Sequence, residues 1–322
     1  MKLIRITKDS GIPLVGCIAF GIIDRGTDMI QVRPTSVCNQ KCIYCSTNAN
    51  NLKVHPVNYE VELNYLLEYV EEVAKFKEML IECNIDSVGE VMAYPKIIEL
   101  VKGLRKMKGV KRISMQTNGS LMTPATVKEL EKAGVGQINL SINTLDVNLA
   151  KKLAGVEHYD VKKVVEVAKT IAASKIELLL APVWMPKLNE MGEIIELAKE
   201  LDAKIGIQKY EVYKYSRKAK SKPVTYWKFY DELRKLEKEH GAKLILTKED
   251  MNIKKAKRLP TKFGEGERVQ LELKCEGWWS GQMLGVGKNR VVTINNCKAK
   301  PNDLVNVKIL ENKNNIYLAE IA

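Results

Sequence analysis

The sequence is poor in the residues and segments that would indicate histidine chemistry or a membrane. Its three histidines, His55, His158 and His240, are scattered and suggest no acid–base centre. An apolar stretch from Ile12 to Ile23 follows basic residues, as in a signal peptide, but no small-residue cleavage site follows it. The stretch is also too short to span a bilayer, which needs about 20 apolar residues. We therefore expect no membrane partner.

The same stretch predicts a strand. Asp24-Arg25-Gly26 comes directly after it and is typical of a hairpin turn. We interpret residues 1–28 as an N-terminal β-extension.

The seven cysteines do not suggest a disulfide framework, because seven is an odd number and a tight triplet has poor geometry for disulfides. With no sign of secretion, we expect a reducing cytoplasm, in which thiols remain free to bind metal. Four of them form no second close pair or triplet and are interpreted as ordinary buried thiols. These four are Cys17, Cys83, Cys275 and Cys297.

The other three cysteines, Cys38, Cys42 and Cys45, lie within eight residues, after the apolar run 29–33 and a Pro-Thr-Ser turn. Three thiolates this close in sequence can converge on one soft metal centre, either zinc or an iron–sulfur cluster. A closed site of either kind needs four protein ligands. Three thiols without an obvious fourth therefore suggest a centre with one open position, where a substrate or cofactor binds.

The stretch Arg33-Pro-Thr-Ser-Val-Cys-Asn-Gln-Lys-Cys-Ile-Tyr-Cys resembles the CxxxCxΦC signature of the radical S-adenosylmethionine (radical SAM) superfamily, in which Φ is aromatic. The resemblance implies a [4Fe-4S] cluster held by the three cysteines, with SAM chelated at the open iron and Tyr44 against the adenine. It also implies an electron donor such as ferredoxin or flavodoxin, and cleavage of SAM to methionine and a 5′-deoxyadenosyl radical. No side chain supplies a radical able to break a strong C–H bond, so the cofactor provides that chemistry.

Strand-like and helix-like runs alternate between residues 29 and 246. The predicted strands are 29–33, 79–88, 112–117, 137–142, 176–183 and 204–212. The predicted helices are 60–77, 95–108, 124–133, 160–173, 189–201 and 225–240. This alternation predicts an α/β fold with parallel strands, either a barrel or a doubly wound sheet. The resemblance implies a partial (β/α)6 TIM-type barrel, assigned to 29–262, with its chemistry at the carboxyl ends of the strands.

The resemblance also implies a SAM pocket at those strand ends. Gly89-Glu90 matches part of the family's Gly-Gly-Glu-like motif, in which Val88 replaces the first glycine. The resemblance implies further SAM-binding residues, two where the third strand ends and two within the fourth strand, the latter at the ribose hydroxyls. They are Thr117, Asn118, Ser141 and Asn143. For the last two, the alternation of a half-buried strand would give the same pattern without a ligand.

The net charge of +13 is concentrated in one segment, because residues 204–262 contain 18 basic and 7 acidic residues. This large excess of basic over acidic residues indicates a polyanion partner. The alternative explanation is that the lysines serve only solubility. Part of the segment interleaves aromatic rings with cations, as in proteins that bind unpaired RNA. The predicted RNA-binding residues are Tyr213, Tyr215, Arg217, Lys218, Lys220 and Lys222.

Residues 264–322 contain short β-runs separated by Gly, Asn and Pro turns, which predicts a small β-barrel. The pattern around 281–305 resembles a TRAM domain, an OB-like RNA-binding module. Trp278-Trp279, in a turn-like stretch, is either an exposed stacking pair or a hydrophobic plug between domains.

Together these features favour a radical SAM enzyme that modifies RNA, and we expect its target to be a tRNA nucleotide splayed out of its stack. The sequence shows no pattern of the N-terminal three-cysteine domain of radical SAM methylthiotransferases, and none of a cobalamin-binding domain. It therefore does not predict which bond the reaction forms. One alternative is a radical SAM enzyme acting on a protein or small molecule. Another is a zinc-stabilised RNA-binding protein without catalysis.

Overall fold

The computed structural model describes all residues, 1–322, and divides into two compact units. The first unit contains residues 1–37, 50–112 and 254–322, and the second contains 38–49 and 113–253. None of the helices is both long enough and apolar enough to cross a bilayer.

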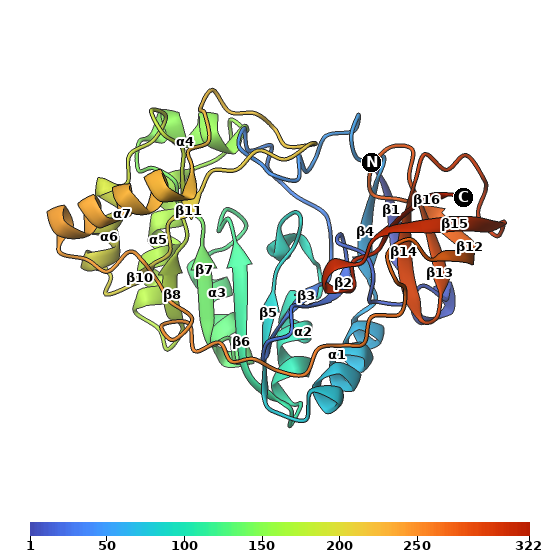
Figure 1. Cartoon of the computed structure of the whole chain (residues 1–322). Coiled ribbons are helices and arrows are strands. Elements are labelled where there is room, and N and C mark those ends of the chain that lie inside the picture. Colours follow the sequence, from blue (N-terminus) through green and yellow to red (C-terminus); the bar gives the residue numbers. More distant parts are fainter. The chain divides into compact units, whose positions relative to one another are not determined.

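Before residue 113, the first unit contains two small groups of strands with helices beside them (Figure 1). Its elements before residue 113 are β1 Lys2–Ile6, η1 Lys8–Ser10, β2 Gly21–Asp24, β3 Met29–Arg33, β4 Val57–Val61, α1 Leu63–Lys77, β5 Ile81–Ile85, η2 Val91–Ala93 and α2 Ile97–Arg105. Strand β1 pairs in parallel with β4. Strand β3 pairs antiparallel with β2 and in parallel with β5. The predicted hairpin turn after Asp24 is therefore confirmed.

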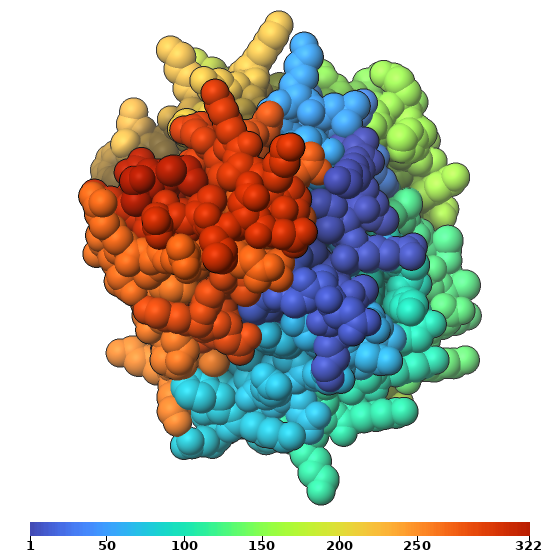
Figure 2. Space-filling model, turned by 90° about the vertical axis from the view of Figure 1, so that its right-hand side faces the viewer, coloured from blue at the N-terminus to red at the C-terminus, as the bar shows by residue number.

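The predicted strand over the apolar stretch 12–23 is wrong except for its last residues, which form β2. The stretch is buried by packing against the C-terminal barrel instead of by a strand ladder. Val291 donates its backbone N–H to Val15 O at 2.9 Å, and a Cβ on Gly16 would lie 2.0 Å from Val291 O. Figure 2 shows the N-terminal segment in blue directly beside the orange and red barrel.

The second unit contains a parallel sheet in the order β10-β8-β7-β6, with α3, α4 and α5 among its helices (Figure 1). Its elements are β6 Val110–Thr117, α3 Pro124–Ala133, β7 Gln137–Leu140, α4 Val147–Ala154, α5 Val161–Ala172, β8 Glu177–Leu180, β9 Val183–Trp184, α6 Gly192–Glu200, β10 Lys204–Ile205, β11 Gln208–Lys209 and α7 Tyr226–His240. Capping side chains begin several helices: Thr123 Oγ1 accepts from Thr126 N–H, and Asp160 from Lys162 N–H. The predicted alternation of strands and helices is confirmed.

Three details differ from the prediction. The predicted strand 204–212 is two short strands, β10 and β11, and β11 pairs with β9 instead of extending the sheet. The fourth strand ends at Leu140, so Ser141 and Asn143 lie in the loop after it. Helix α4 and strand β4 were not predicted, because both are short: α4 has eight residues and β4 has five.

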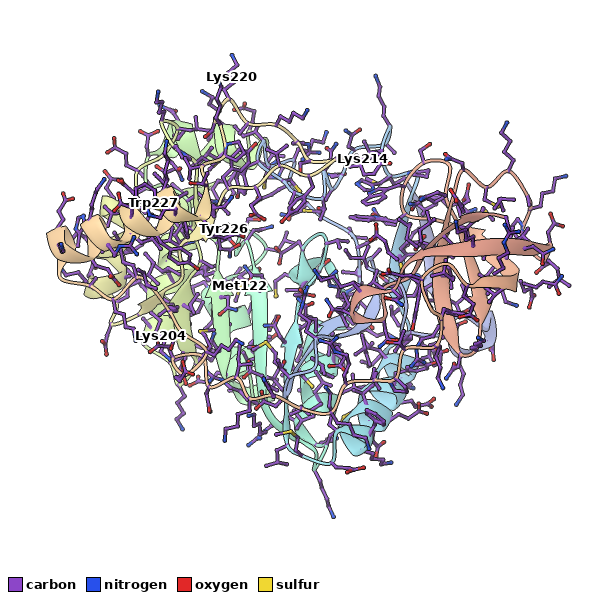
Figure 3. All side chains as sticks on the ribbon, in the orientation of Figure 1. Met122, Lys204, Lys214, Lys220, Tyr226 and Trp227 are labelled. Atoms are coloured by element: carbon purple, nitrogen blue, oxygen red, sulfur yellow. The ribbon has the colours of Figure 1, made fainter.

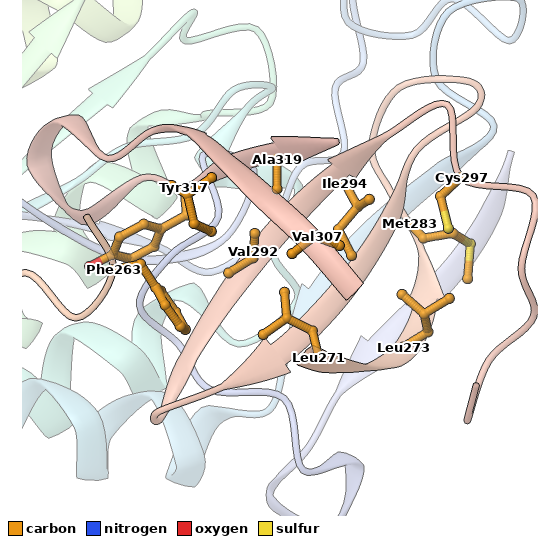
Figure 4. Packing of buried hydrophobic residues seen from close by; sticks show 11 residues of the cluster. Phe263, Leu271, Leu273, Met283, Val292, Ile294, Cys297, Val307, Tyr317 and Ala319 are labelled. Carbon is orange, nitrogen blue, oxygen red and sulfur yellow. The ribbon is translucent and has the colours of Figure 1, made fainter. Parts of the chain in front are cut away.

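The C-terminal strands close into a barrel in the order β12-β13-β14-β16-β15. They are β12 Arg268–Glu276, β13 Met283–Gly287, β14 Arg290–Asn295, β15 Leu304–Glu311 and β16 Leu318–Ile321, with η3 Lys313–Asn315 before the last. The barrel has its own buried core, in which Phe263 and Tyr317 meet edge to face at 5.3 Å (Figure 4). The predicted small β-barrel is confirmed.

A buried ion pair fixes the chain on its way into this barrel. Lys77 Nζ donates to Asp24 Oδ1 at 2.6 Å, and neither side chain is exposed to solvent. Asp24 Oδ2 also accepts from Leu259 N–H at 2.7 Å. The segment around Leu259, which precedes the barrel, is therefore hydrogen-bonded to the β2–β3 hairpin.

Candidate active site

The loop Cys38–Ala49 in the second unit contains the three clustered cysteines. Its centre is a turn in which Cys45 donates its backbone N–H to Cys42 O at 3.1 Å. Helix α4 supports one side: Lys41 N–H donates to Ala154 O and Ile43 N–H to Leu153 O, both at 3.0 Å. The orphan carbonyls at the end of a helix thus bind the loop.

Gly155 follows α4 in the left-handed conformation, with φ of 66°. A Cβ at this position would lie 2.1 Å from Lys41 O, far inside van der Waals contact. Only glycine therefore allows α4 and the cysteine loop to approach this closely.

Residues from the region before α7 bind the same loop from another direction. Arg217 donates from its backbone to Cys45 O at 2.9 Å, and from its guanidinium to Ala49 O at 2.6 Å and Cys42 O at 3.3 Å. Ser216 Oγ donates to Ser46 O at 2.9 Å. The loop is therefore held in place by hydrogen bonds to its backbone carbonyls.

None of the three cysteines is in a disulfide, and all three are half-buried. Cys42 Sγ donates to Gln40 Oε1 at 3.1 Å, and Cys45 Sγ lies 3.2 Å from Thr47 Oγ1. Burial, and next the neighbouring Cys45, raises the pKa of the Cys42 thiol to about 12. As the side chains stand, no three His, Cys, Asp or Glu residues are arranged to hold a metal ion. The fit to an iron–sulfur cluster rests on donor chemistry: three thiols outside any disulfide lie in a restrained loop beside a guanidinium.

A small recess adjoins the loop within the same unit. Its volume is about 20 Å³, on the scale of one water molecule, so it is too small to hold a whole cofactor. The lining residues are mostly polar or aromatic. They are Gln40, Tyr44, Asn118, Ser141, Asn143, Thr144, Ala150, Leu153, Ala154 and Tyr159.

Asn143 organises one wall of this recess. Its Nδ2 donates to Tyr44 OH at 2.6 Å, and its Oδ1 accepts from Val183 N–H at 2.7 Å. Burial raises the pKa of Tyr44 well above its ordinary value, so the phenol stays neutral. The buried Asn189 donates to Asn143 O at 2.8 Å and completes the connection to the loop after β8.

Four of the predicted SAM residues, Tyr44, Asn118, Ser141 and Asn143, thus line one recess. Thr117 is buried, and its Oγ1 accepts from Gly119 N–H at 3.0 Å. Sequence reasoning missed Gln40, Thr144 and Tyr159 as lining residues. Gln40 lies inside the cysteine motif and could have been found there, whereas Tyr159 follows the unpredicted α4.

The predicted pair Gly89-Glu90 lies in the first unit, against Val37. Glu90 N–H donates to Val37 O at 2.8 Å, and a Cβ on Gly89 would lie 2.2 Å from the same oxygen. The Glu90 carboxylate is buried and accepts from Met92 N–H at 3.0 Å, which caps η2. The pair therefore supports the residue before Cys38, and its contact with SAM stays a prediction.

A groove of about 730 Å³ lies in the basic part of the second unit. Four lysines line it, no carboxylate does, and none of these lysines makes an ion pair within the chain. They are Lys187, Lys220, Lys222 and Lys228. Next to it, α7 begins with exposed rings: Tyr226 is 57% exposed and Trp227 69%. Figure 3 shows both rings at the start of α7 and Lys220 in the loop before it.

The predicted RNA-binding residues have different surroundings. Lys220 and Lys222 line the groove, and Lys218 is exposed. Tyr213 is 57% exposed, and its hydroxyl donates to Glu211, which raises the pKa of Tyr213 to about 12. Tyr215 is half-buried, and Lys214 Nζ lies 5.2 Å from its ring centre. The Arg217 guanidinium donates hydrogen bonds to the cysteine loop. Their contact with RNA stays a prediction.

The idea that Trp278 and Trp279 form an exposed stacking pair is wrong. Trp278 is only 3% exposed, and His55 stacks on its ring at 4.0 Å. His55 Nδ1 also lies 3.0 Å from Trp278 O. The two tryptophans, stacked 6.1 Å apart, instead pack against the segment that follows the cysteine loop.

The sequence matches the Radical SAM superfamily over residues 32–209, and the chain belongs to this family. It is therefore a radical SAM enzyme, of a family that uses a [4Fe-4S] cluster and SAM and needs an electron donor. This membership sets aside the alternative of a non-catalytic zinc protein.

Three similar proteins illustrate the range within the family. An uncharacterized protein of Methanocaldococcus jannaschii is 39% identical and is matched over 96% of this chain and 79% of its own length. A probable GTP 3′,8-cyclase of Thermoplasma volcanium is 25% identical over 67% of this chain and 63% of its own. The structure of Streptococcus suis SuiB bound to S-adenosylmethionine aligns with a TM-score of 0.53, at 20% identity, over 68% of this chain and 49% of SuiB.

Proposed function

We propose that Cys38, Cys42 and Cys45 hold the cluster and that the adjoining recess binds part of SAM. The observation that supports this most strongly is the position of Tyr44, which lies between two of the cysteines in sequence and lines the recess. When bound, the cluster and SAM supply a one-electron cleavage that yields methionine and a 5′-deoxyadenosyl radical. No other part of the chain offers comparable chemistry.

The chain's own residues orient the cofactor and exclude water. Ser141 and Asn118 present polar groups to the recess, while Leu153 and Ala154 make its apolar side. Asn143 fixes the Tyr44 ring through its hydroxyl, so that the ring presents a constant face to a bound adenine. In this arrangement the protein contributes position and shielding, which is its usual part in cofactor chemistry.

For the substrate we propose RNA, and specifically a tRNA. The lysine groove supports this because unpaired ammonium groups neutralise phosphates, and exposed aromatic rings stack on unpaired bases. The strand order of the C-terminal barrel is consistent with an OB-like, TRAM-like module, which supports a second contact with RNA. The predicted domains, 1–28, 29–262 and 264–322, belong to this proposal.

Binding of total tRNA across a salt series tests the substrate. The full-length protein with Lys187, Lys220, Lys222 and Lys228 all changed to Gln is compared with a control in which four exposed lysines of α3 and α5 change to Gln. These are Lys128, Lys132, Lys162 and Lys163. We expect the groove variant to lose about 0.7–0.9 from the slope of log K against log salt for each phosphate contact removed. Absence of tRNA binding to the unmodified protein at low salt would rule out RNA.

A small phosphorylated nucleotide is the second candidate substrate. The similarity to GTP 3′,8-cyclases favours it, and the same lysines suit a triphosphate. Titration with GTP distinguishes the two, since saturable GTP binding that tRNA does not displace favours the nucleotide.

A further inference from the structure

Ser216 and Arg217 make an unusually dense set of contacts with the cysteine loop. Their four hydrogen bonds end on the carbonyls of residues 42, 45, 46 and 49, one on each. The two residues lie about 170 positions further along the chain than the loop, as the separations of 168 to 175 show. Nothing in the charge pattern of the sequence distinguishes Arg217 from the lysines around it.

The segment that presents these two residues is itself well supported. Ser216 is buried, and its Oγ accepts from Tyr213 N–H at 2.8 Å while donating to the loop. The buried Tyr210 accepts from Ala219 N–H at 3.0 Å. These contacts close residues 210–219 into a compact turn. The backbone of Arg217 is therefore held in place by its own segment as well as by the hydrogen bonds of its side chain.

The chemistry of the guanidinium decides what it contributes. Its planar fork reaches two carbonyls seven residues apart, which the single ammonium of lysine cannot do in the same geometry. It is also permanently charged, and it lies at the turn between Cys42 and Cys45. A fixed positive charge there favours whichever state of the site is more negative.

We propose that Ser216 and Arg217 are positioning residues for the cysteine loop, holding it in the shape that binds the cluster and stabilising the reduced, more negative cluster. This rests on the proposed assignment of the three cysteines as cluster ligands. Loss of the Arg217 charge therefore makes the cluster harder to reduce, and loss of its hydrogen bonds loosens the loop.

Four variants of the full-length protein separate these effects. Arg217→Gln removes the charge and the fork, and Arg217→Lys keeps the charge and removes the fork. Ser216→Ala removes the hydrogen bond to Ser46 O and the one that Ser216 Oγ accepts from Tyr213 N–H. Lys218→Gln is the matched control, since it removes one charge from the next residue, whose side chain is exposed.

The first measurement is hydrogen–deuterium exchange of residues 41–49 before iron and sulfide are added. We expect exchange to be faster by at least about three- to ten-fold, the change typical of losing one hydrogen bond, because Arg217→Gln, Arg217→Lys and Ser216→Ala each lose one or more. Lys218→Gln should match the unmodified protein. Unchanged exchange in all three loop variants would overturn the positioning role, whether or not a cluster forms.

The second measurement is the midpoint potential of the reconstituted cluster, followed by electron paramagnetic resonance. The potential should become more negative in Arg217→Gln and stay close to that of the unmodified protein in Arg217→Lys and Lys218→Gln. Equal potentials in all variants would overturn the electrostatic part. If the unmodified protein forms no cluster, the proposed function fails, and the exchange result still decides the positioning role.

Discussion

Replacing Lys77 with methionine should destabilise the first unit by about 3–5 kcal/mol, the usual cost of breaking a buried ion pair from one side. The ammonium donates to Asp24 Oδ1 at 2.6 Å and to Thr27 O at 3.0 Å, and both charged side chains are fully buried. Methionine has a similar volume, so little of the loss comes from a cavity. What remains is a buried carboxylate with only backbone donors, from Gly26 and Leu259.

Urea denaturation measured by tryptophan fluorescence and by circular dichroism provides the assay. Lys75→Met is the matched control, because Lys75 lies on the same helix in an exposed pair with Glu71 at 2.9 Å. Such a pair contributes about 0.3–0.5 kcal/mol. The double variant Asp24→Asn with Lys77→Met should recover part of the loss, since it leaves no unpaired charge. A loss for Lys77→Met no larger than for Lys75→Met would refute this account of the pair.

Three further predictions concern the second unit. Gly155→Ala should loosen the contact between α4 and the cysteine loop, because the new Cβ would lie 2.1 Å from Lys41 O; faster amide exchange at Lys41 and Ile43 is the measurement, and unchanged exchange would contradict it. Trp227→Ala should weaken tRNA binding by about 1–3 kcal/mol if one base stacks on this ring, and Trp227→Phe should bind tRNA about as tightly as the unmodified protein. Equal tRNA affinities of Trp227→Ala and the unmodified protein would exclude stacking. The Lys243 ammonium lowers the pKa of Asp250 to about 2. The stabilisation is therefore present above the ordinary aspartate pKa and lost as pH falls towards 2, and a nuclear magnetic resonance titration of Asp250 with an ordinary midpoint would refute the pair.

The sequence predicted most of the architecture because long amphipathic helices and the cysteine motif are local patterns. Helix α5 begins at a capping aspartate and buries a regular apolar face, so its period is visible in one chain. Helix α4 has only eight residues, and its contacts with the loop at Lys41 and Ile43 come from tertiary structure. A short stretch of sequence therefore does not predict that α4 supports the cysteine loop.

The same limit explains the errors about individual side chains. The stretch 12–23 is apolar because it lies against the barrel, and apolar composition alone does not distinguish that burial from a strand. Arg217 lies in a basic run, and the sequence shows its charge but not the carbonyls that its guanidinium reaches. Four of the predicted SAM residues line one recess because strand ends in a parallel sheet meet at one edge.

The measurement that tests the central claim most directly is anaerobic reconstitution with iron and sulfide, followed by SAM and a reductant. The unmodified protein should bind about four iron atoms per chain and release 5′-deoxyadenosine. Cys42→Ala should do neither, and Cys275→Ala, which changes a half-buried thiol outside the loop, should do both. SAM cleavage by Cys42→Ala at the unmodified rate would contradict the assignment of the three cysteines as the ligands of the cluster.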